Sequence, residues 1–375
     1  MEFRDLKKQY HYLKSEIDAA IVGVATSGTY IGGEQVNELE KELAAYVGTK
    51  HCLSCANGTD ALSLALMAWG IKEGDAVFVP DFTFFASAEV VASCGATPIF
   101  VDVEKETFNI CPISLEASID RVLSEGRLIP KVILTVDLFG LPANYPLVRQ
   151  VADKHKLLIL EDGAQGFGGK IGNKRACSFG DISTTSFFPA KPLGCYGDGG
   201  AIFTDNDQWA SLIQSLKLHG KGMHKYDNVR IGINSRMDSI QAAILRVKFN
   251  AFKAYELDAI NRAAERYTER LKESVQTPTI STGFYSSWAQ YTILLDNQDQ
   301  RNALQTVLKK EGIPSMVYYP SPMHMQTAFA HLPYSSDHYP IANILCNTCL
   351  SLPLHPYMDE KETEQVAKAI TLFLK

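Results

Sequence analysis

The chain has 375 residues, with 36 Lys and Arg against 42 Asp and Glu, and a formal net charge of -6. Single cores stop growing at about 250 to 300 residues, so this length predicts two domains. The charge balance and the lack of a basic run argue against a nucleic-acid partner. No apolar run is long enough for a membrane span, and the charged start resembles no signal peptide, so we expect a cytoplasmic protein.

A first helix is predicted from Leu6 to about Thr26, packed against one domain or a partner subunit. The stretch Ser54-Cys-Ala-Asn-Gly-Thr-Asp-Ala-Leu then predicts a turn at Asn57-Gly58 that leads into a helix, with Thr59 as its N-cap. A helix start opened by glycine suits an anion, because its amides are free and Gly58 permits close approach. The other interpretation is a helix cap without a ligand.

From about residue 51 to residue 204, short β-branched runs alternate with helical segments. This pattern predicts an α/β fold with a mostly parallel sheet covered on both faces. Crossover helices are expected at 86–93, 114–123 and 145–155. Strands are expected at 76–80, 98–102, 131–137, 157–162, 182–187 and 200–204. In such sheets, ligands bind beyond the carboxyl ends of the strands.

One of these strands ends in Glu161-Asp162 and is followed by glycines. A carboxylate at this place can hold a protonated ring nitrogen, which keeps a heteroaromatic cofactor cationic. The other interpretation is that Asp162 caps the following segment. Gln165, three residues further on, either orients a ring substituent or is solvated.

The next strand leads into Thr-Ser-Phe-Phe-Pro-Ala-Lys-Pro-Leu-Gly, in which Lys191 stands between two prolines. Pro189 and Pro192 donate no backbone hydrogen bond, and Pro192 disfavours a helical Lys191, so a stiff loop is predicted. A rigid, partly buried amine loses its proton more readily and can attack a carbonyl group. Lys191 alone could still be an exposed loop lysine. Together with the turn at Asn57-Gly58, which suits a phosphate group and is called the phosphate turn below, and with Asp162, Lys191 points to pyridoxal 5'-phosphate.

The alternating pattern ends after a helix that begins near Ser235, and a long charged helix is expected over residues 249–273. Further strands are expected at 290–295 and 314–319. We therefore predict a large cofactor-binding domain at residues 1–250 and a smaller α+β domain at 251–375.

Two cysteine pairs, Cys52 with Cys55 and Cys346 with Cys349, have the spacing of zinc ligands. Each pair lies in an apolar segment, where a reduced cysteine behaves as a small buried hydrophobic side chain. Buried thiols are therefore favoured over zinc ligands, and no metal is expected.

At this point nearly the whole chain resembles the DegT/DnrJ/StrS family of sugar aminotransferases, of the fold type I pyridoxal-phosphate class. Within the family it is most similar to the group that aminates UDP-linked 3-oxo-hexuluronates. The stretches that carry the resemblance are Gly28-Thr-Tyr-Ile-Gly-Gly, Cys55-Ala-Asn-Gly-Thr-Asp-Ala-Leu, Pro80-Asp-Phe-Thr-Phe-Phe-Ala-Ser-Ala-Glu, Glu161-Asp-Gly-Ala-Gln, the stretch from Ser186 to Ala201 around Lys191, Leu218-His-Gly, Asn234-Ser-Arg-Met-Asp and Ser351-Leu-Pro-Leu-His-Pro.

The resemblance implies a role for each matching position. Lys191 corresponds to the catalytic lysine that forms the Schiff base, Asp162 to the partner of the pyridine nitrogen, and Gln165 to the residue beside the ring hydroxyl. Phosphate contacts are implied for Gly58, Thr59 and Ser186, ring stacking for Phe84, and a phosphate contact from the other subunit for Asn234. A homodimer with shared active sites follows from the last of these.

The implied reaction moves an amino group from L-glutamate to a nucleotide-linked keto sugar, with a UDP-linked 3-oxo-N-acetylglucosaminuronate as the favoured acceptor. Arg236 is expected to bind the substrate anion or to be solvated. Where many relatives have His-Tyr-Pro, this chain has Tyr318-Tyr-Pro, followed by His324, and both are expected in the sugar pocket. A 4-keto-6-deoxy sugar therefore stays open as the acceptor. A non-catalytic homologue that binds the cofactor or the sugar is the alternative of another class.

Overall fold

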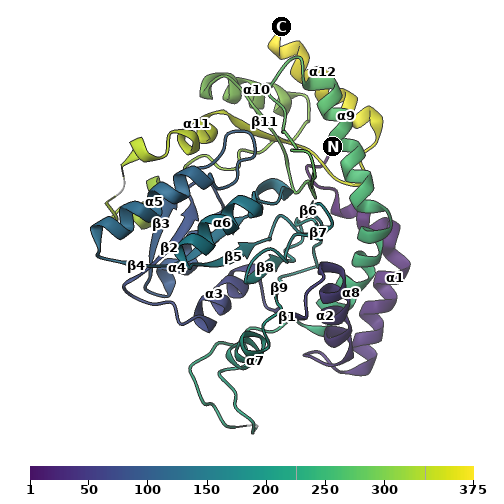
Figure 1. Cartoon of the computed structure of the whole chain (residues 1–375). Helices are drawn as coiled ribbons and strands as arrows, with labels where there is room; N and C mark the ends of the chain where they lie inside the picture. Colours follow the sequence, from purple (N-terminus) through teal and green to yellow (C-terminus); the bar gives the residue numbers. More distant parts are fainter. Residues whose placement is uncertain (225, 334) are drawn as a thin grey trace.

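The computed structural model describes residues 1–224, 226–333 and 335–375 and is built around a seven-stranded sheet (Figure 1). The strands lie in the order β1-β9-β8-β5-β4-β2-β3. β8, β5, β4, β2 and β3 run parallel, whereas β9 is antiparallel to both of its neighbours, so the predicted mostly parallel sheet is confirmed. The bounds are β1 His51–Cys55, β2 Asp75–Pro80, β3 Thr97–Val101, β4 Ile129–Val136, β5 Leu158–Asp162, β8 Ile182–Ser186 and β9 Gly200–Thr204.

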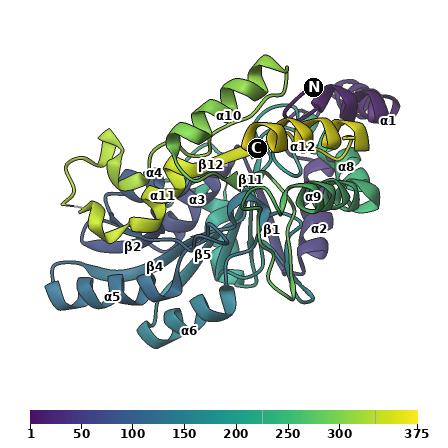
Figure 2. The same cartoon turned by 90° about the horizontal axis from the view of Figure 1, so that it is seen from above.

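Helices cover both faces of this sheet, as Figure 2 shows from above. Along β4, Ile133 points to the helices of one face, whereas Val132 and Leu134 point to those of the other. Because both faces are buried, the strands are continuous apolar runs. The first face carries α5 Pro112–Glu125 and α6 Tyr145–His155, and the second carries α3 Gly58–Ala68, α4 Ala86–Ser93 and α7 Asp207–Leu216.

The remaining segments build the edge next to β1 and the C-terminal part. α1, α2 and α8 pack together at the β1 edge, and α9, α10 and α12 pack around the antiparallel pair β11–β12. Their bounds are α1 Leu6–Ser27, α2 Glu34–Val47, α8 Ser239–Ala251, η2 Phe252–Glu256, α9 Leu257–Leu271, α10 Gln298–Lys310, α11 Pro340–Thr348, α12 Glu360–Leu374, β6 Lys170–Ile171, β7 Lys174–Arg175, β10 Phe284–Tyr285, β11 Tyr291–Leu294, β12 Cys349–Leu352, η1 Leu138–Gly140, η3 Met323–Met325, η4 Thr327–Phe329 and η5 Ser336–His338.

The predicted domain boundary near residue 250 falls within a helical run. α8 continues through η2, a segment with π-helical hydrogen bonds, into α9. Phe249 of α8 and Leu352 of β12 belong to one buried cluster, so side chains from both predicted domains share a core. The division into 1–250 and 251–375 stays a prediction. None of the described helices has the length and apolarity needed to cross a membrane.

Two local predictions are wrong. The strand expected at 314–319 is absent, because only Met316 forms a bridge, to Ser351, and Pro314 has no amide to donate. The N-cap of α3 is Asn57 rather than Thr59. The Asn57 side chain accepts from the Asp60 amide at 2.8 Å, so the helix begins at Gly58.

Glu161 gives a testable prediction about stability. This buried carboxylate of β5 accepts hydrogen bonds from the amides of Cys177, Phe179 and Gly180 and from the Ser183 hydroxyl. Glu161→Ala leaves the Cys177 and Phe179 amides and the Ser183 hydroxyl without an acceptor, at about 1 to 3 kcal/mol each, whereas the Gly180 amide keeps the Ser183 oxygen as an acceptor. We expect the free energy of unfolding to fall by at least about 3 kcal/mol, measured by urea denaturation.

The matched control is Glu38→Ala, which removes an exposed carboxylate from α2. Exposed ion pairs contribute little, so the free energy of unfolding of this variant stays within about 0.5 kcal/mol of the wild type. Equal unfolding midpoints for both variants would contradict the structural role of Glu161.

Candidate functional site

The loop that carries Lys191 connects β8 to β9 and is closed by its own backbone. The Lys191 amide donates to the Phe188 carbonyl at 2.9 Å. A Cβ added to Gly194 would lie 2.5 Å from the Pro189 carbonyl oxygen, so the chain crosses itself closely at this glycine. The prediction of a non-helical loop around Lys191 is thus confirmed, and its stiffness stays a prediction.

The side chain of Lys191 is partly buried and lies in the field of two opposite charges. Burial lowers the pKa of its amine, the Asp162 carboxylate opposes this shift, and the Arg4 guanidinium assists it. A lowered pKa increases the share of neutral amine, which is the form that attacks a carbonyl carbon and accepts a proton.

Asp162 ends β5 and is buried with two hydrogen bonds. Its Oδ2 accepts from the Ser87 hydroxyl at 2.8 Å, and its Oδ1 accepts from the Ala164 amide at 3.1 Å. Burial raises the pKa of the carboxyl group, whereas these two hydrogen bonds and Lys191 lower it. The side chain therefore caps the following turn and also stays available as a counter-charge.

The start of α3 meets the end of β8. A Cβ added to Gly58 would lie 2.8 Å from the Cβ of Ser186, so only glycine permits this contact. Asn57 occupies the Asp60 amide, which leaves the first amides of the helix to an outside acceptor. Thr59 is partly exposed beside them. A helix start with an adjacent hydroxyl group is a fitting phosphate site.

Gln165 and Phe84 lie on two sides of a tyrosine. Gln165 is buried, accepts from the Phe139 amide at 2.7 Å through Oε1, and donates to the Tyr319 hydroxyl at 3.1 Å through Nε2. The Phe84 ring is 54% exposed, and its centroid lies 6.3 Å from that of Tyr319. The exposed Phe84 face is thus free to stack on a planar ligand.

The predicted sugar-pocket residues differ in their surroundings. Tyr318 is partly buried and contacts the ring of Phe3 edge-on at 6.2 Å. His324 is buried, with Nδ1 2.7 Å from the Asp81 carboxylate and Nε2 3.2 Å from the Ser336 hydroxyl. Both ring nitrogens thus have partners, and His324 connects Asp81 to Ser336. A direct substrate contact stays a prediction for both residues.

Asn234 and Arg236 are exposed and follow a loop that projects from the body after α7 (Figure 1). Between them, the Ser235 hydroxyl accepts from the Ala56 amide at 3.0 Å, which ties the loop base to the phosphate turn. Arg236 also lines an open hollow of about 910 Å³. The hollow is lined by Leu218, His219, Lys221, Asn228, Val229, Arg230, Ile231, Gly232 and Arg236.

Three residues of the site were not found from the sequence. Ser87 donates a hydrogen bond to Asp162, and Tyr319 accepts one from Gln165. Both residues lie within stretches that resemble the family, so their positions in these stretches could have indicated them. Arg4 approaches Lys191 from the N-terminus, and no local pattern indicates this contact.

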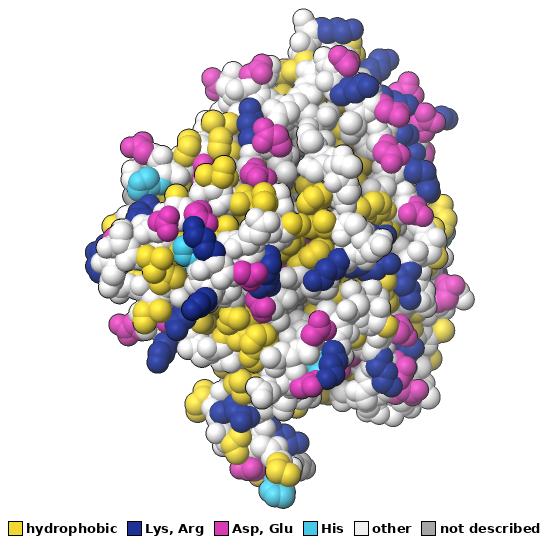
Figure 3. Space-filling model, in the orientation of Figure 1, with side chains coloured by type: hydrophobic (Ala, Val, Ile, Leu, Met, Phe, Trp, Pro, Cys, Tyr) yellow, Lys and Arg dark blue, Asp and Glu magenta, His cyan; other side chains and the backbone are white. Residues whose placement is uncertain are grey.

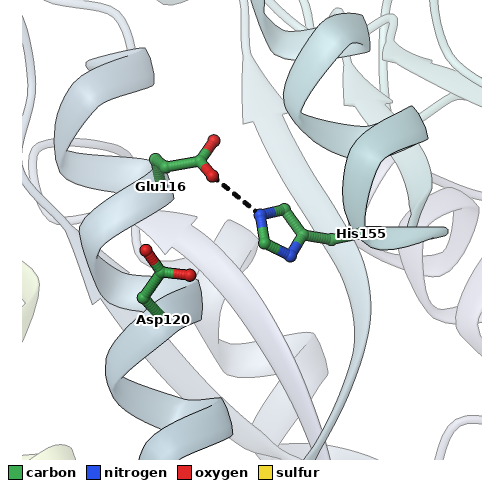
Figure 4. Close-up of side chains that lie close together, drawn as sticks. All are labelled: Glu116, Asp120 and His155. Carbon is green, nitrogen blue, oxygen red and sulfur yellow. Dashed lines mark hydrogen bonds and ion pairs between the residues drawn. The ribbon is translucent and has the colours of Figure 1, made fainter.

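Among the described residues, one cluster has the ligand types of a metal site: Glu116 and Asp120 on α5 with His155 at the end of α6 (Figure 4). The Lys154 ammonium group also binds Glu116, so a cation already occupies this carboxylate and the group joins two helices. The cysteines with zinc-like spacing are buried free thiols, as expected: Cys52, Cys55, Cys346 and Cys349.

Comparisons with known proteins agree with this geometry. The model of the DegT/DnrJ/EryC1/StrS aminotransferase family matches residues 11–371. The chain is 41% identical to UDP-2-acetamido-2-deoxy-3-oxo-D-glucuronate aminotransferase of Pseudomonas aeruginosa, over 99% of both chains. It is 40% identical to UDP-N-acetyl-3-dehydro-alpha-D-glucosamine 3-aminotransferase of Acidithiobacillus ferrooxidans, over 98% of this chain and 96% of the other. It superimposes on a DegT DnrJ EryC1 StrS aminotransferase from Brucella abortus with a TM-score of 0.97, at 47% identity, covering 100% and 99% of the chains.

Gly58 gives a prediction about ligand binding. Gly58→Ala adds a Cβ that forces Ser186 and the start of α3 apart, so the affinity for pyridoxal 5'-phosphate should fall at least about tenfold, or about 1.4 kcal/mol. A spectrophotometric titration of the apoprotein measures the dissociation constant.

Gly23→Ala is the control, because a Cβ at this helical position of α1 meets nothing within 4 Å. This variant should keep the wild-type dissociation constant. An unchanged affinity of Gly58→Ala for pyridoxal 5'-phosphate would contradict the predicted place of Gly58 in the phosphate site.

Proposed function

Because the chain belongs to the DegT/DnrJ/EryC1/StrS aminotransferase family, we propose that it transfers an amino group from L-glutamate to a nucleotide-linked keto sugar. Its cofactor is pyridoxal 5'-phosphate, as in the family. The observation that carries the proposal is the partly buried Lys191 amine in the field of Asp162, at the carboxyl ends of β5 and β8.

The described residues fit this cofactor. The contact between Gly58 and Ser186 leaves helix amides and a hydroxyl group for a phosphate, which a larger residue at position 58 would disturb. Asp162 supplies a fixed negative charge for a protonated ring nitrogen, and Phe84 supplies an exposed aromatic face. When bound, pyridoxal 5'-phosphate supplies a carbonyl carbon that accepts the amine and a ring that withdraws electrons.

The chain itself then has to hold charges and move a proton. Burial favours the neutral form of Lys191 Nζ, which would take a proton from the carbon that carries the donor's amino group and return it to the former carbonyl carbon of the cofactor, on the other side of the nitrogen. Asp162 stays oriented by Ser87 and Ala164 while this happens. The Gln165 side chain is held by the Phe139 amide and the Tyr319 hydroxyl, and it can direct a further hydrogen bond at a ring substituent.

For the acceptor, we propose a UDP-linked 3-oxo-N-acetylglucosaminuronate. The two relatives above, both at about 40% identity over nearly the whole chain, are named for 3-oxo or 3-dehydro sugars linked to UDP. The hollow at Arg236 also contains Lys221 and Arg230, and three cationic side chains suit the charge of a nucleotide diphosphate.

A homodimer with shared sites is part of the proposal. The loop after α7 extends beyond the globular surface in Figure 3 and exposes apolar side chains at its end. Met223 is 95% exposed and Ile231 is 90% exposed. Exposed apolar groups on a projecting segment are typical of a subunit contact. Asn234 lies where this loop returns to the body of the protein, and it would then contribute to the active site of the partner subunit.

The first test follows the two half-reactions. Holoprotein mixed with L-glutamate should release one equivalent of 2-oxoglutarate per site and lose the absorbance of the bound aldehyde form. The aminated cofactor should then transfer its amino group to the UDP-linked 3-oxo uronate, and so return to the aldehyde form, much faster than with UDP- or dTDP-linked 4-keto-6-deoxy sugars. Lys191→Ala should lower turnover by about 10²- to 10⁴-fold, because the proton carrier is lost.

Lys41→Ala, which removes an exposed lysine from α2, is the matched control and should keep wild-type turnover. Cofactor binding without 2-oxoglutarate release would favour the non-catalytic alternative. Faster amino transfer to a 4-keto sugar would overturn the proposed acceptor and leave the transaminase assignment intact.

The second test asks whether sites are shared between subunits. Lys191→Ala and Asn234→Ala should each be nearly inactive as pure dimers. After unfolding and refolding together in equal amounts, half of the dimers are mixed and contain one intact site, so about a quarter of the wild-type activity should return. Activity that stays at the level of the separate variants would place both residues in one subunit's site.

A further inference from the structure

The segment that precedes α1 passes beside the Lys191 loop. The Phe3 carbonyl accepts from the Leu354 amide at 3.2 Å, which fixes this N-terminal segment to the C-terminal part. The next residue, Arg4, donates through Nη2 to the Lys191 carbonyl at 2.7 Å and to the Pro192 carbonyl at 3.2 Å. A guanidinium group has a planar set of donors, so it can hold two successive carbonyls in one geometry.

Arg4 is a desolvated cation in this position. Burial lowers the pKa of its guanidinium to about 10, although the negative charge of Glu256 opposes the shift. Its Nη1 is buried and has no hydrogen-bond partner among the described residues. Glu256 is itself shared, since it accepts from the Gln9 amide group at 2.8 Å and from the Tyr357 hydroxyl at 2.6 Å. A buried charge with incomplete partners is costly to stability, which suggests a use beyond packing.

Arg4 and Lys191 line a small cavity, and the other ionisable groups that line it are Asp5, Lys248, His355 and Tyr357. Lys248 of α8 lies there with a pKa lowered to about 8 by burial, and burial lowers the pKa of His355 to about 4, so its imidazole is neutral near pH 7. Two charged groups act on the Lys191 amine: the Asp162 carboxylate favours its charged form, and the Arg4 guanidinium disfavours it.

We propose that Arg4 is a positioning residue for Lys191: its guanidinium fixes the backbone of the Lys191 loop, and its charge keeps a second cation from forming at the Lys191 amine. This inference rests on the proposed role of Lys191. It assigns to the N-terminal segment, far from the strand ends in sequence, a part in setting the reactivity of the site.

The two parts of this role can be separated by substitution. Arg4→Gln keeps a side-chain donor for the carbonyls and removes the charge. Arg4→Lys keeps the charge and removes the planar pair of donors. A merely structural arginine would respond to both changes through stability alone, whereas the proposed role ties the charge to the ionisation of one particular lysine.

The experiment measures the reactivity of Lys191 in the apoprotein. Acetic anhydride labels neutral amines, and peptide mass spectrometry gives the labelling rate of Lys191 over a pH series. In Arg4→Gln the midpoint of this profile should move to higher pH. At a pH below the midpoint, labelling should slow about 3- to 10-fold, which corresponds to a pKa change of about 0.5 to 1 unit. Arg4→Lys should keep the wild-type midpoint but lower kcat with little change in KM.

Lys7→Gln is the matched control, because it removes one positive charge from the first turn of α1, close to Arg4 in the sequence, at a side chain that is 91% exposed. Its profile should coincide with that of the wild type. A wild-type profile in Arg4→Gln would overturn the proposal, and if that variant does not fold, wild-type kcat in Arg4→Lys would overturn it. A wild-type Lys191 that borohydride cannot couple to pyridoxal 5'-phosphate would instead refute the proposed function.

Discussion

The whole arrangement depends on keeping a partly buried amine and a buried carboxylate within each other's electrostatic field. Burial disfavours the charged form of both, and each opposes this for the other, as the opposite pKa shifts of Lys191 and Asp162 indicate. Such a pair is stable only when neither group can move to water. The parallel sheet provides this condition, because the carboxyl ends of β5 and β8 lie at one edge and fix both backbones.

Around this pair, the shape of the site is set by glycines, whose lack of a Cβ allows close backbone contacts. Gly58 lies against Ser186, and a Cβ on Gly200 would lie 2.4 Å from the Asn57 carbonyl oxygen. The turn before α3 and the start of β9 therefore approach more closely than residues with a Cβ permit. Two glycine-containing stretches, about 140 residues apart in the sequence, are thereby brought together at the proposed phosphate site.

The sequence predicted the parts of the molecule that follow from local pattern. Buried parallel strands are apolar runs, so the sheet and the residues at its strand ends could be located, and with them Asp162 and Lys191. Contacts between distant segments could not be derived in this way. Arg4 reaches Lys191 across 187 residues, and His324 reaches Asp81 across 243. The strand prediction for residues 314–319 was wrong for a related reason: only Met316 forms a backbone bridge, and Tyr318 packs on the distant ring of Phe3.

The cofactor side and the substrate side of the site differ in the kind of contact that builds them: the first depends on local sequence pattern, the second on contacts between distant segments. The cofactor side rests on strand ends and glycine turns of one sheet, where a small shift breaks a close backbone contact. The proposed substrate side combines Tyr318, an exposed loop with Arg236, and a segment held by the pair of His324 and Asp81. Side chains on loops can change without disturbing the sheet. The transamination chemistry is therefore tightly constrained by the fold, while the choice of sugar can vary among chains that share it.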